Sequence, residues 1–237
     1  MVAVIYTANF GHYDDLHEPP EQDEPCEFIC FTDRRAPSRV GKWRIIRIRR
    51  DRRLHPRVQA KRFKLLSHEV FVDGQLATRY GVWNPSDRID LSIWIDGNRH
   101  IKSSTFLSDM RRQMGDGDWA VFVHPDRDCI YEEAAICASL RKCRNLPVLA
   151  QVESYQDIVP PHGGLYCNTI VVRREPSMAR LQCVYESWWR EILKWTNRDQ
   201  LSLTYVLRQT EGCDPVIIPE HVRHNDWFNT VPHRKNT

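Results

Sequence analysis

The sequence predicts an α/β fold with a mainly parallel central sheet flanked by helices. Short apolar runs alternate along the chain with longer segments in which apolar residues recur every three or four positions. The clearest longer segment places Met178, Leu181, Tyr185, Trp188 and Ile192 at helical spacing. Strands that alternate with helices favour a parallel sheet. A chain of 237 residues suits one domain of this class, which we expect to span residues 1–237.

The first half of the chain is expected to contain four strands and two helices. Apolar runs rich in β-branched and aromatic residues predict strands at residues 2–6, 27–33, 43–48 and 90–95. Polar and proline-rich stretches predict loops between the first two strands. Pro56 suits the first turn of a helix that runs to about Phe71. A serine at position 103 or 104 could cap a second helix over residues 105–114.

The second half repeats this alternation. Short apolar runs predict strands at residues 119–123, 165–172 and 216–218. Apolar residues at helical spacing predict helices at residues 131–143, 178–195 and 199–208. The last segment, from about residue 221, is expected to be an irregular tail.

Composition narrows the class of protein. No run approaches the ~18 apolar residues that a membrane span requires, and the first residues lack the features of a secretory signal, so we expect a cytoplasmic protein. The eight cysteines contain no Cys-x-x-Cys pair and are expected to be reduced and mostly buried. The alternative is a zinc site built from Cys26, Cys30 and either His12 or His17, although this spacing matches no common ligand pattern.

Charge is unevenly distributed along the chain. The stretch from Arg34 to Lys64 holds 14 of the 34 basic residues and one acidic residue, Asp51. Residues 14–27, just before it, hold seven acidic residues and no lysine or arginine. The basic stretch is either a solvated face paired with the acidic segment or a surface that binds a polyanion.

The most informative motif lies where a predicted strand ends. The apolar run of residues 90–95 stops at Asp96, Gly97 and Asn98. Divalent metals prefer carboxylate and carbonyl oxygens, and a diphosphate can complete their shell. Gly97 lets the backbone turn and lets a bulky anion approach closely. An apolar strand followed by an Asx turn is the alternative interpretation.

Other polar residues are expected at the same edge of the sheet. Ligands of open α/β sheets bind beyond the carboxyl ends of the strands. The polar residues predicted at those ends are Thr7, Asn9, Asp33, Asp96, Asn98 and His124. The glycine-rich dinucleotide motif and the phosphate-loop lysine motif are absent from the sequence, which argues against a Rossmann dehydrogenase and a phosphate-loop nucleotidase.

Several segments occur in an order that is similar to that of a known family. They are YTANFGHYD (residues 6–14), FTD (31–33), AKRFKLLSH (60–68), SIWIDGN (92–98), HPDR (124–127), YEEA (131–134) and RDQLS (198–202). Over roughly residues 2–210, the chain resembles the glycosyltransferase-like family first catalogued as domain of unknown function 616. The combination of SIWIDG with the HPxR segment is the most specific part of this resemblance.

The resemblance implies a GT-A-like transferase whose donor is a nucleotide-sugar, with a UDP-sugar expected. Such enzymes hold Mn²⁺ or Mg²⁺ with an Asp-x-Asp motif or a variant of it. Here Asn98 occupies the third position and coordinates more weakly than Asp would. The implied metal ligands are Asp96, Asn98 and His224, because His224 resembles a late histidine that many GT-A enzymes bring back to the metal. An ordinary surface histidine is the alternative interpretation of His224.

The resemblance also suggests donor-binding and catalytic roles. The residues expected at the donor are Thr7, Asn9, Asp33, Lys61, Arg62, Asp96 and Asn168. Asp199 is the expected base for the acceptor hydroxyl, although the comparable Asp-Gln pair of retaining relatives binds sugar. His124 and Arg127 would contact phosphate or acceptor, and Glu132 or Glu133 is the alternative base. Each of these residues also has a non-functional interpretation. The polar residues at strand ends could simply form turns, the basic residues could lie on a solvated helix face, and the acidic residues could stabilise helix N-termini.

A metal-dependent nucleotide-sugar glycosyltransferase is therefore the expected function. If the basic stretch binds a polyanion, one acceptor is DNA with a hydroxylated base, held through its phosphates. A surface polysaccharide or a lipid-linked glycan is the other acceptor class. A non-catalytic nucleic-acid-binding module would explain the basic stretch but not Asp96 or Asp199. A nucleotidyltransferase or hydrolase would use the same metal-diphosphate site.

Overall fold

The computed structural model describes residues 2–71 and 89–234, and its centre is an eight-stranded sheet in the order β3-β4-β2-β1-β5-β8-β7-β9. Its strands are β1 (Val2–Asn9), β2 (Cys26–Thr32), β3 (Arg39–Val40), β4 (Trp43–Arg47), β5 (Ile89–Ile95), β7 (Trp119–Val123), β8 (Tyr166–Arg174) and β9 (Val216–Ile218). A two-stranded antiparallel sheet pairs β6 (Arg99–Ile101) with β10 (Phe228–Thr230).

The large sheet is mainly parallel. Strands β4, β2, β1 and β5 run in one direction, and β9 runs parallel to β7. Strand β8 is antiparallel to both of its neighbours, β5 and β7, so these two strands point the same way. The carboxyl ends of β1, β2, β5 and β7 therefore lie at one edge of the sheet. This arrangement confirms the predicted fold class.

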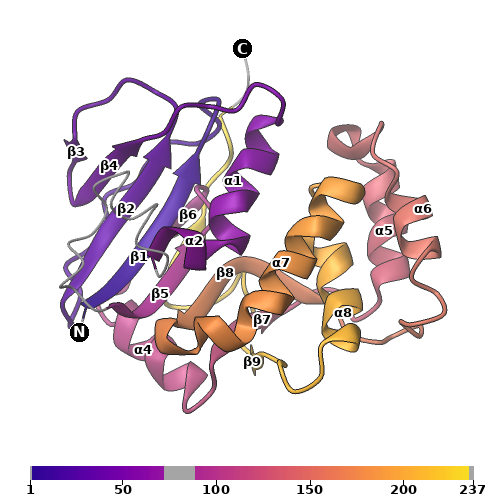
Figure 1. Ribbon diagram of the computed structural model, residues 1–237. Helices are drawn as coiled ribbons and strands as arrows, with labels where there is room; N and C mark the ends of the chain where they lie inside the picture. Colours follow the sequence, from indigo (N-terminus) through magenta and orange to yellow (C-terminus); the bar gives the residue numbers. More distant parts are fainter. Residues whose placement is uncertain (1, 72–88, 235–237) are drawn as a thin grey trace.

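Helices flank the sheet (Figure 1). They are α1 (Pro56–Leu65), α2 (Ser67–Phe71), α4 (Phe106–Met114), α5 (Ile130–Ser139), α6 (Val148–Glu153), α7 (Met178–Lys194) and α8 (Asp199–Gln209), with 3₁₀ turns η1 (Arg141–Cys143) and η2 (Glu175–Ser177). Within the described ranges, no helix is both long and apolar enough to cross a membrane.

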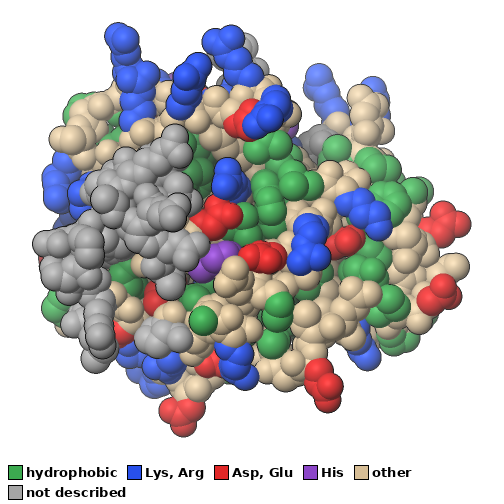
Figure 2. Space-filling model, viewed as in Figure 1, with side chains coloured by type: hydrophobic (Ala, Val, Ile, Leu, Met, Phe, Trp, Pro, Cys, Tyr) green, Lys and Arg blue, Asp and Glu red, His purple; other side chains and the backbone are tan. Residues whose placement is uncertain are grey.

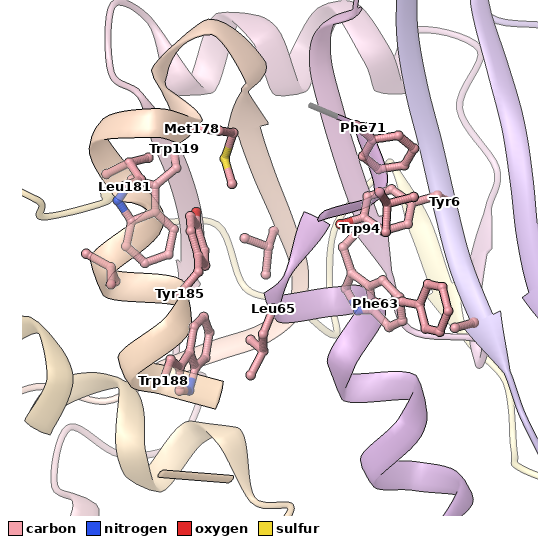
Figure 3. Packing of buried hydrophobic residues seen from close by; sticks show 14 of the residues in the cluster. Tyr6, Phe63, Leu65, Phe71, Trp94, Trp119, Met178, Leu181, Tyr185 and Trp188 are labelled. Atoms are coloured by element: carbon pink, nitrogen blue, oxygen red, sulfur yellow. The ribbon is translucent and has the colours of Figure 1, made fainter. Parts of the chain in front are cut away.

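Two apolar clusters cover the opposite faces of the sheet. Side chains alternate along β1, so Val4 and Tyr6 join one cluster while Ala3 and Ile5 join the other. The first cluster packs the sheet against α1 and α7 (Figure 3). In this cluster the Tyr6 ring makes edge contacts with Phe71 and Trp94, at centroid distances of 4.9 and 5.4 Å. These contacts fix Trp94, which lies two residues before Asp96.

Several predicted boundaries differ from the structure. Strand β1 continues to Asn9, where a loop was expected from Thr7, because it pairs with β2 from Ala3 to its last residue. The helix expected over residues 56–71 is interrupted at Leu66, whose backbone is not helical (φ −102°, ψ 49°). The C-terminal segment is not irregular throughout, since it contains β10. The helix expected over residues 131–143 ends at Ser139.

The cysteines follow the expectation of buried thiols. All eight are free, and only Cys26 and Cys183 are not buried. The alternative zinc site at Cys26 and Cys30 is not formed, because in the described part of the chain neither cysteine belongs to a group of potential ligand atoms close enough to share a metal. Burial raises the pKa of both thiols to about 12, so they remain protonated.

A buried polar network crosses the first cluster. Arg173 on β8 is fully buried and donates hydrogen bonds to the Tyr6 hydroxyl (3.0 Å) and to the Lys64 carbonyl (2.6 Å). Glu175, two residues later, is 5% exposed. Its burial raises its pKa from 4.5 to about 7, although the charge of Arg173 opposes this shift.

We expect a Glu175→Gln variant to lose part of the pH dependence of stability. Because the folded-state pKa is raised, the folded protein retains a proton that the unfolded chain releases between pH 4.5 and about pH 7. The free energy of unfolding of the wild type should therefore fall by about 3 kcal/mol as pH rises through this window. Urea denaturation at both ends of the window measures the difference. If the free energy of unfolding fell equally in the wild type and in the variant, Glu175 would not titrate in this way.

Candidate active site

A cavity of about 190 Å³ opens at the carboxyl ends of β1 and β5. Ala8 and Phe10 line it from β1 and the residue that follows this strand, and Asp96 lines it from the end of β5. Lys61 on α1 and Asp199 at the start of α8 complete its wall. The cavity thus gathers residues from segments that are far apart in the sequence, at the edge where a parallel sheet presents its ligand site.

Asp96 is held firmly while it still reaches the cavity. Its Oδ1 accepts a hydrogen bond from Trp94 Nε1 (2.8 Å) and lies 3.5 Å from Lys64 Nζ. Its backbone N–H donates to the Thr169 carbonyl on β8 (2.8 Å), and its own carbonyl accepts from the Arg99 N–H (2.9 Å). The Asp96 side chain is 29% exposed. Packing therefore orients this carboxylate toward the cavity without enclosing it.

A second carboxylate, that of Asp14, lines the same cavity and lies beside Gly97, the residue that follows Asp96. A methyl group at Gly97 would come within 2.8 Å of Asp14 Oδ2, so a larger residue at this position would displace the Asp14 side chain. Asn9 holds the loop in place, because its Oδ1 accepts from the Tyr13 N–H (3.0 Å) and its Nδ2 donates to the Asp14 carbonyl (2.5 Å). Asp14 was not among the residues that the sequence singled out for a role.

The C-terminal segment brings a histidine to Asp14 and to the cavity. His233 lines the cavity, and its Nδ1 lies 2.5 Å from Asp14 Oδ1. Pairing of β10 with β6 and a hydrogen bond from the Val231 N–H to the Asn98 carbonyl (2.9 Å) lead the chain back to this point. Two carboxylates and an imidazole suit Mn²⁺ or Mg²⁺, which prefer oxygen-rich sites. The donor types around the cavity therefore suit the expected metal, but in the described part of the chain the ligand atoms of Asp14, Asp96 and His233 do not all lie within 4.8 Å of one another, so these side chains would have to close on the ion.

Asp199 forms a buried ion cluster with two lysines. Its Oδ2 lies 2.8 Å from Lys61 Nζ and 2.6 Å from Lys64 Nζ. The two lysines are three positions apart on α1 and therefore share one helix face. Burial by itself would raise the pKa of Asp199, but the two ammonium groups hold it well below its usual range. Asp199 is thus a firmly ionised carboxylate and, in this arrangement, a weak proton acceptor.

A second polar cluster adjoins the cavity. Buried Glu133 on α5 accepts hydrogen bonds from Arg127 (3.0 and 2.7 Å) and Arg198 (3.1 Å), and His124 Nε2 lies 3.8 Å from it. Burial opposes ionisation of Glu133, but its hydrogen bond with Arg127 and the nearby positive charges hold its pKa below the ordinary value. Arg198 also lines the cavity, so it joins the two groups of residues.

Some of the residues selected from the sequence lie away from the cavity. Thr7 is buried inside β1, and the Asp33 carboxylate accepts a hydrogen bond from the Gly11 N–H (3.1 Å). Arg62 pairs with Glu69 on α2 (2.8 Å) instead of facing the cavity. None of these three side chains lines the cavity.

Three more of the residues selected from the sequence also lie outside the cavity. Glu132 is exposed on the first turn of α5, whereas its neighbour Glu133 is the buried carboxylate of the second cluster. His224 lies against His221, with ring centroids 4.7 Å apart, and neither His224 nor Asn98 lines the cavity. His233 is the histidine that returns to the cavity, where it contacts Asp14.

Asn168 on β8 is almost fully buried, and neither of its side-chain polar atoms has a hydrogen-bond partner in the described part of the chain. It lies where β8 departs from regular pairing with β7, and the next residue, Thr169, binds the backbone of Asp96. A buried amide without partners is unusual in a native protein, and a bound ligand or water is a common reason.

Comparison with protein families identifies the family of the chain. The family model described as "TOD1/MUCI70, glycosyltransferase-like domain" matches residues 1–230, which include Asp14, Asp96 and Asp199, while His233 lies just beyond the match. Among curated protein sequences, none matches the chain significantly. The match confirms the resemblance to a glycosyltransferase-like family that the sequence motifs indicated. The chain belongs to the TOD1/MUCI70 family of glycosyltransferase-like domains.

Proposed function

We propose that the protein transfers a sugar from a nucleoside-diphosphate donor, a UDP-sugar in the first instance, to an acceptor hydroxyl with the help of Mn²⁺ or Mg²⁺. The family supports a glycosyltransferase in general terms. The observation that carries the finer proposal is that Asp96, Asp14, His233 and the Lys61–Asp199 pair meet in one cavity at the carboxyl ends of β1 and β5.

In this proposal, the residues divide into an acidic side and a basic side of the cavity. Asp96, Asp14 and His233 would close on the metal and hold it, and the metal would supply positive charge that stabilises the departing diphosphate. Lys61 is 18% exposed at the side chain and would contact the phosphates, whereas Lys64 is 1% exposed and would hold Asp96 and Asp199 in place. Such fixed charges stabilise a transition state without having to reorganise.

The acceptor proton needs a carboxylate of adequate basicity. With both lysines in contact, Asp199 binds protons weakly. A diphosphate that competes for Lys61 would draw one ammonium away from Asp199, and its pKa would then rise toward the ordinary value. We propose that donor binding activates Asp199 as the base in this way. The carboxylate would otherwise hydrogen-bond a hydroxyl of the donor sugar.

The surroundings of the cavity favour an anionic acceptor. A groove of about 790 Å³ shares Tyr13, Arg57 and Asn197 with the cavity and is also lined by Arg53 and Arg141. Further exposed arginines from the basic stretch, Arg47, Arg49, Arg50 and Arg52, line a second open groove. Lys and Arg side chains stand along the upper edge of the molecule in Figure 2. Hydroxylated DNA and an anionic surface glycan are the two acceptors to be compared.

Nucleotide binding tests the donor half of the proposal. We expect UDP together with Mn²⁺ to raise the Tm by roughly 5 °C or more at a hundredfold excess over Kd, and UDP without metal to raise it much less. UMP, which lacks the second phosphate, is the matched control, and GDP and TDP test the base. A nucleotide-sugar screen read by mass spectrometry then identifies the sugar. Equal shifts with UMP and UDP, independent of Mn²⁺, would rule out a metal-diphosphate site.

Charge removal tests the acceptor half. The Arg49→Ser, Arg50→Ser, Arg52→Ser triple variant should bind a polyanionic acceptor more weakly and with a shallower salt dependence. On duplex DNA the logarithmic slope should decrease by roughly 0.9 for each phosphate that the variant no longer neutralises. Donor hydrolysis should be unchanged. The control is the Lys102→Ser, Arg190→Ser, Arg208→Ser triple variant, which makes the same change in charge at exposed residues that do not line either groove. Mobility shifts across a salt series compare the two triple variants. If both weakened binding of the acceptor equally, the basic stretch would have no specific role in acceptor binding.

A further inference from the structure

A thiol, a carboxylate and an imidazole converge outside the cavity. The potential ligand atoms of Cys129, Glu132 and His162 all lie within 4.8 Å of one another. Cys129 occupies the N-cap position of α5 without a side-chain capping hydrogen bond, and Glu132 follows three positions later on the same helix face. His162 comes from the loop between α6 and β8, so segments roughly thirty residues apart build the cluster. None of the three residues lines the cavity.

Backbone contacts hold the two segments together. The Gly164 N–H donates to the Asp128 carbonyl (3.0 Å), and the Tyr131 hydroxyl donates to the Val159 carbonyl (2.5 Å). His162 has a positive φ of 55°, which is sparsely populated for residues other than glycine. Strained backbone of this kind persists only where the surrounding structure imposes it, and it is frequent at binding sites.

Asp128 supplies the partner that a metal-binding histidine usually has. Its Oδ1 lies 2.7 Å from His162 Nδ1. Histidines that bind metals commonly donate their second ring N–H to a carboxylate, which fixes the ring orientation and makes the ligand nitrogen more basic. Asp128 immediately precedes Cys129, so the same turn provides both a ligand and the group that orients another ligand.

We propose that Cys129, Glu132 and His162 form a zinc site that is distinct from the donor cavity. A thiolate with an imidazole favours zinc over magnesium, calcium or manganese, whereas the oxygen-rich cavity favours the harder ions. Ligand atoms around tetrahedral zinc are about 3–4 Å apart, so small movements of the exposed Glu132 and His162 side chains close the site. Three protein ligands leave the fourth position to water.

The proposed zinc site lies on segments that also carry residues of the candidate active site. A zinc ion there would tie the segment that carries His124, Arg127 and Glu133 to the loop that leads into β8 and Asn168. It would thereby fix the second polar cluster beside the cavity. The zinc site does not depend on the proposed function, because binding is measured without donor or acceptor.

Metal titration of the full chain tests the proposal. We expect the wild type to bind one Zn²⁺ at this site, and Co²⁺ in its place to give a thiolate-to-cobalt charge-transfer band that Cys129→Ser removes. His162→Asn and the surface change Glu132→Gln should each weaken Zn²⁺ affinity by at least roughly tenfold. Cys183→Ser, at an exposed cysteine elsewhere, and Asp96→Asn, in the cavity, should leave the band unchanged.

Two results would overturn the zinc site. One is a wild-type protein that shows no thiolate-to-cobalt band and no rise in Tm with micromolar Zn²⁺. The other is that Glu132→Gln and His162→Asn, measured as separate variants, both bind Zn²⁺ as tightly as the wild type does. Because Glu132 is exposed, its replacement does not threaten folding and keeps the test decisive. Retention of Zn²⁺ binding in Asp96→Asn separates this site from the donor cavity.

Discussion

Asp96→Asn is expected to lower kcat/KM for sugar transfer by roughly 10²–10³-fold while the protein stays folded. Asparagine keeps the volume of the side chain and an oxygen that can accept the Trp94 Nε1 hydrogen bond. It removes the negative charge that the proposed metal needs, and asparagine is a weaker ligand than aspartate. Steady-state kinetics at several Mn²⁺ concentrations should show both a lower rate and a higher metal requirement.

Asp90→Asn is the matched control for this experiment. Asp90 lies at the opposite end of the same strand and pairs with Arg111 (2.9 Å). Its replacement should leave transfer and the Mn²⁺ requirement close to those of the wild type. If Asp96→Asn turned over as fast as Asp90→Asn, Asp96 could not be a metal ligand of the reaction.

Asp199→Asn is expected to lower the free energy of unfolding by about 3–5 kcal/mol, because it removes the carboxylate that contacts both Lys61 and the buried Lys64 and leaves Lys64 with the longer contact to Asp96 (3.5 Å). The Tm should fall by roughly 6–20 °C. The depressed folded-state pKa means that the wild-type contribution is present at neutral pH and is lost as pH falls below about 4. Urea denaturation at pH 7 and in the acid range measures both effects.

An exposed ion pair supplies the comparison for Asp199. Asp126 pairs with Arg223 (2.6 Å), but its side chain is 35% exposed. Asp126→Asn should therefore cost no more than about 1 kcal/mol. If Asp199→Asn also lowered the free energy of unfolding by no more than about 1 kcal/mol, Asp199 could not form the buried ion cluster with Lys61 and Lys64.

The sheet could be predicted because its strands are local apolar runs. Strands β7 and β9 have the bounds expected from the sequence, since β7 is a short apolar run between polar residues and β9 is a short apolar run between two prolines. Strand β1 was predicted too short because its last residues are polar. Their strand conformation comes from pairing with β2, where the Thr32 hydroxyl donates to the Asn9 carbonyl (2.8 Å). Tertiary pairing of this kind leaves no local pattern.

The residues of the candidate site that follow a single strand could be predicted from the sequence. The residues that reach the site through pairing of distant segments were harder to predict. Asp96 follows an apolar run and is recognisable from the sequence. His233 reaches the cavity only because β10 pairs with β6, and the residues around His233 carry no local sign of this pairing. The contact of Lys61 and Lys64 with Asp199 had a signal, since three-residue spacing places both lysines on one helix face.

Diffraction from a crystal soaked with Mn²⁺ and UDP tests the central claim most directly, because the anomalous signal of manganese locates the metal without reference to activity. The proposal predicts one manganese peak at coordination distance from Asp96, with the diphosphate beside it and within reach of Lys61. A nucleotide bound elsewhere, or a manganese peak that Asp96 does not contact, would contradict it.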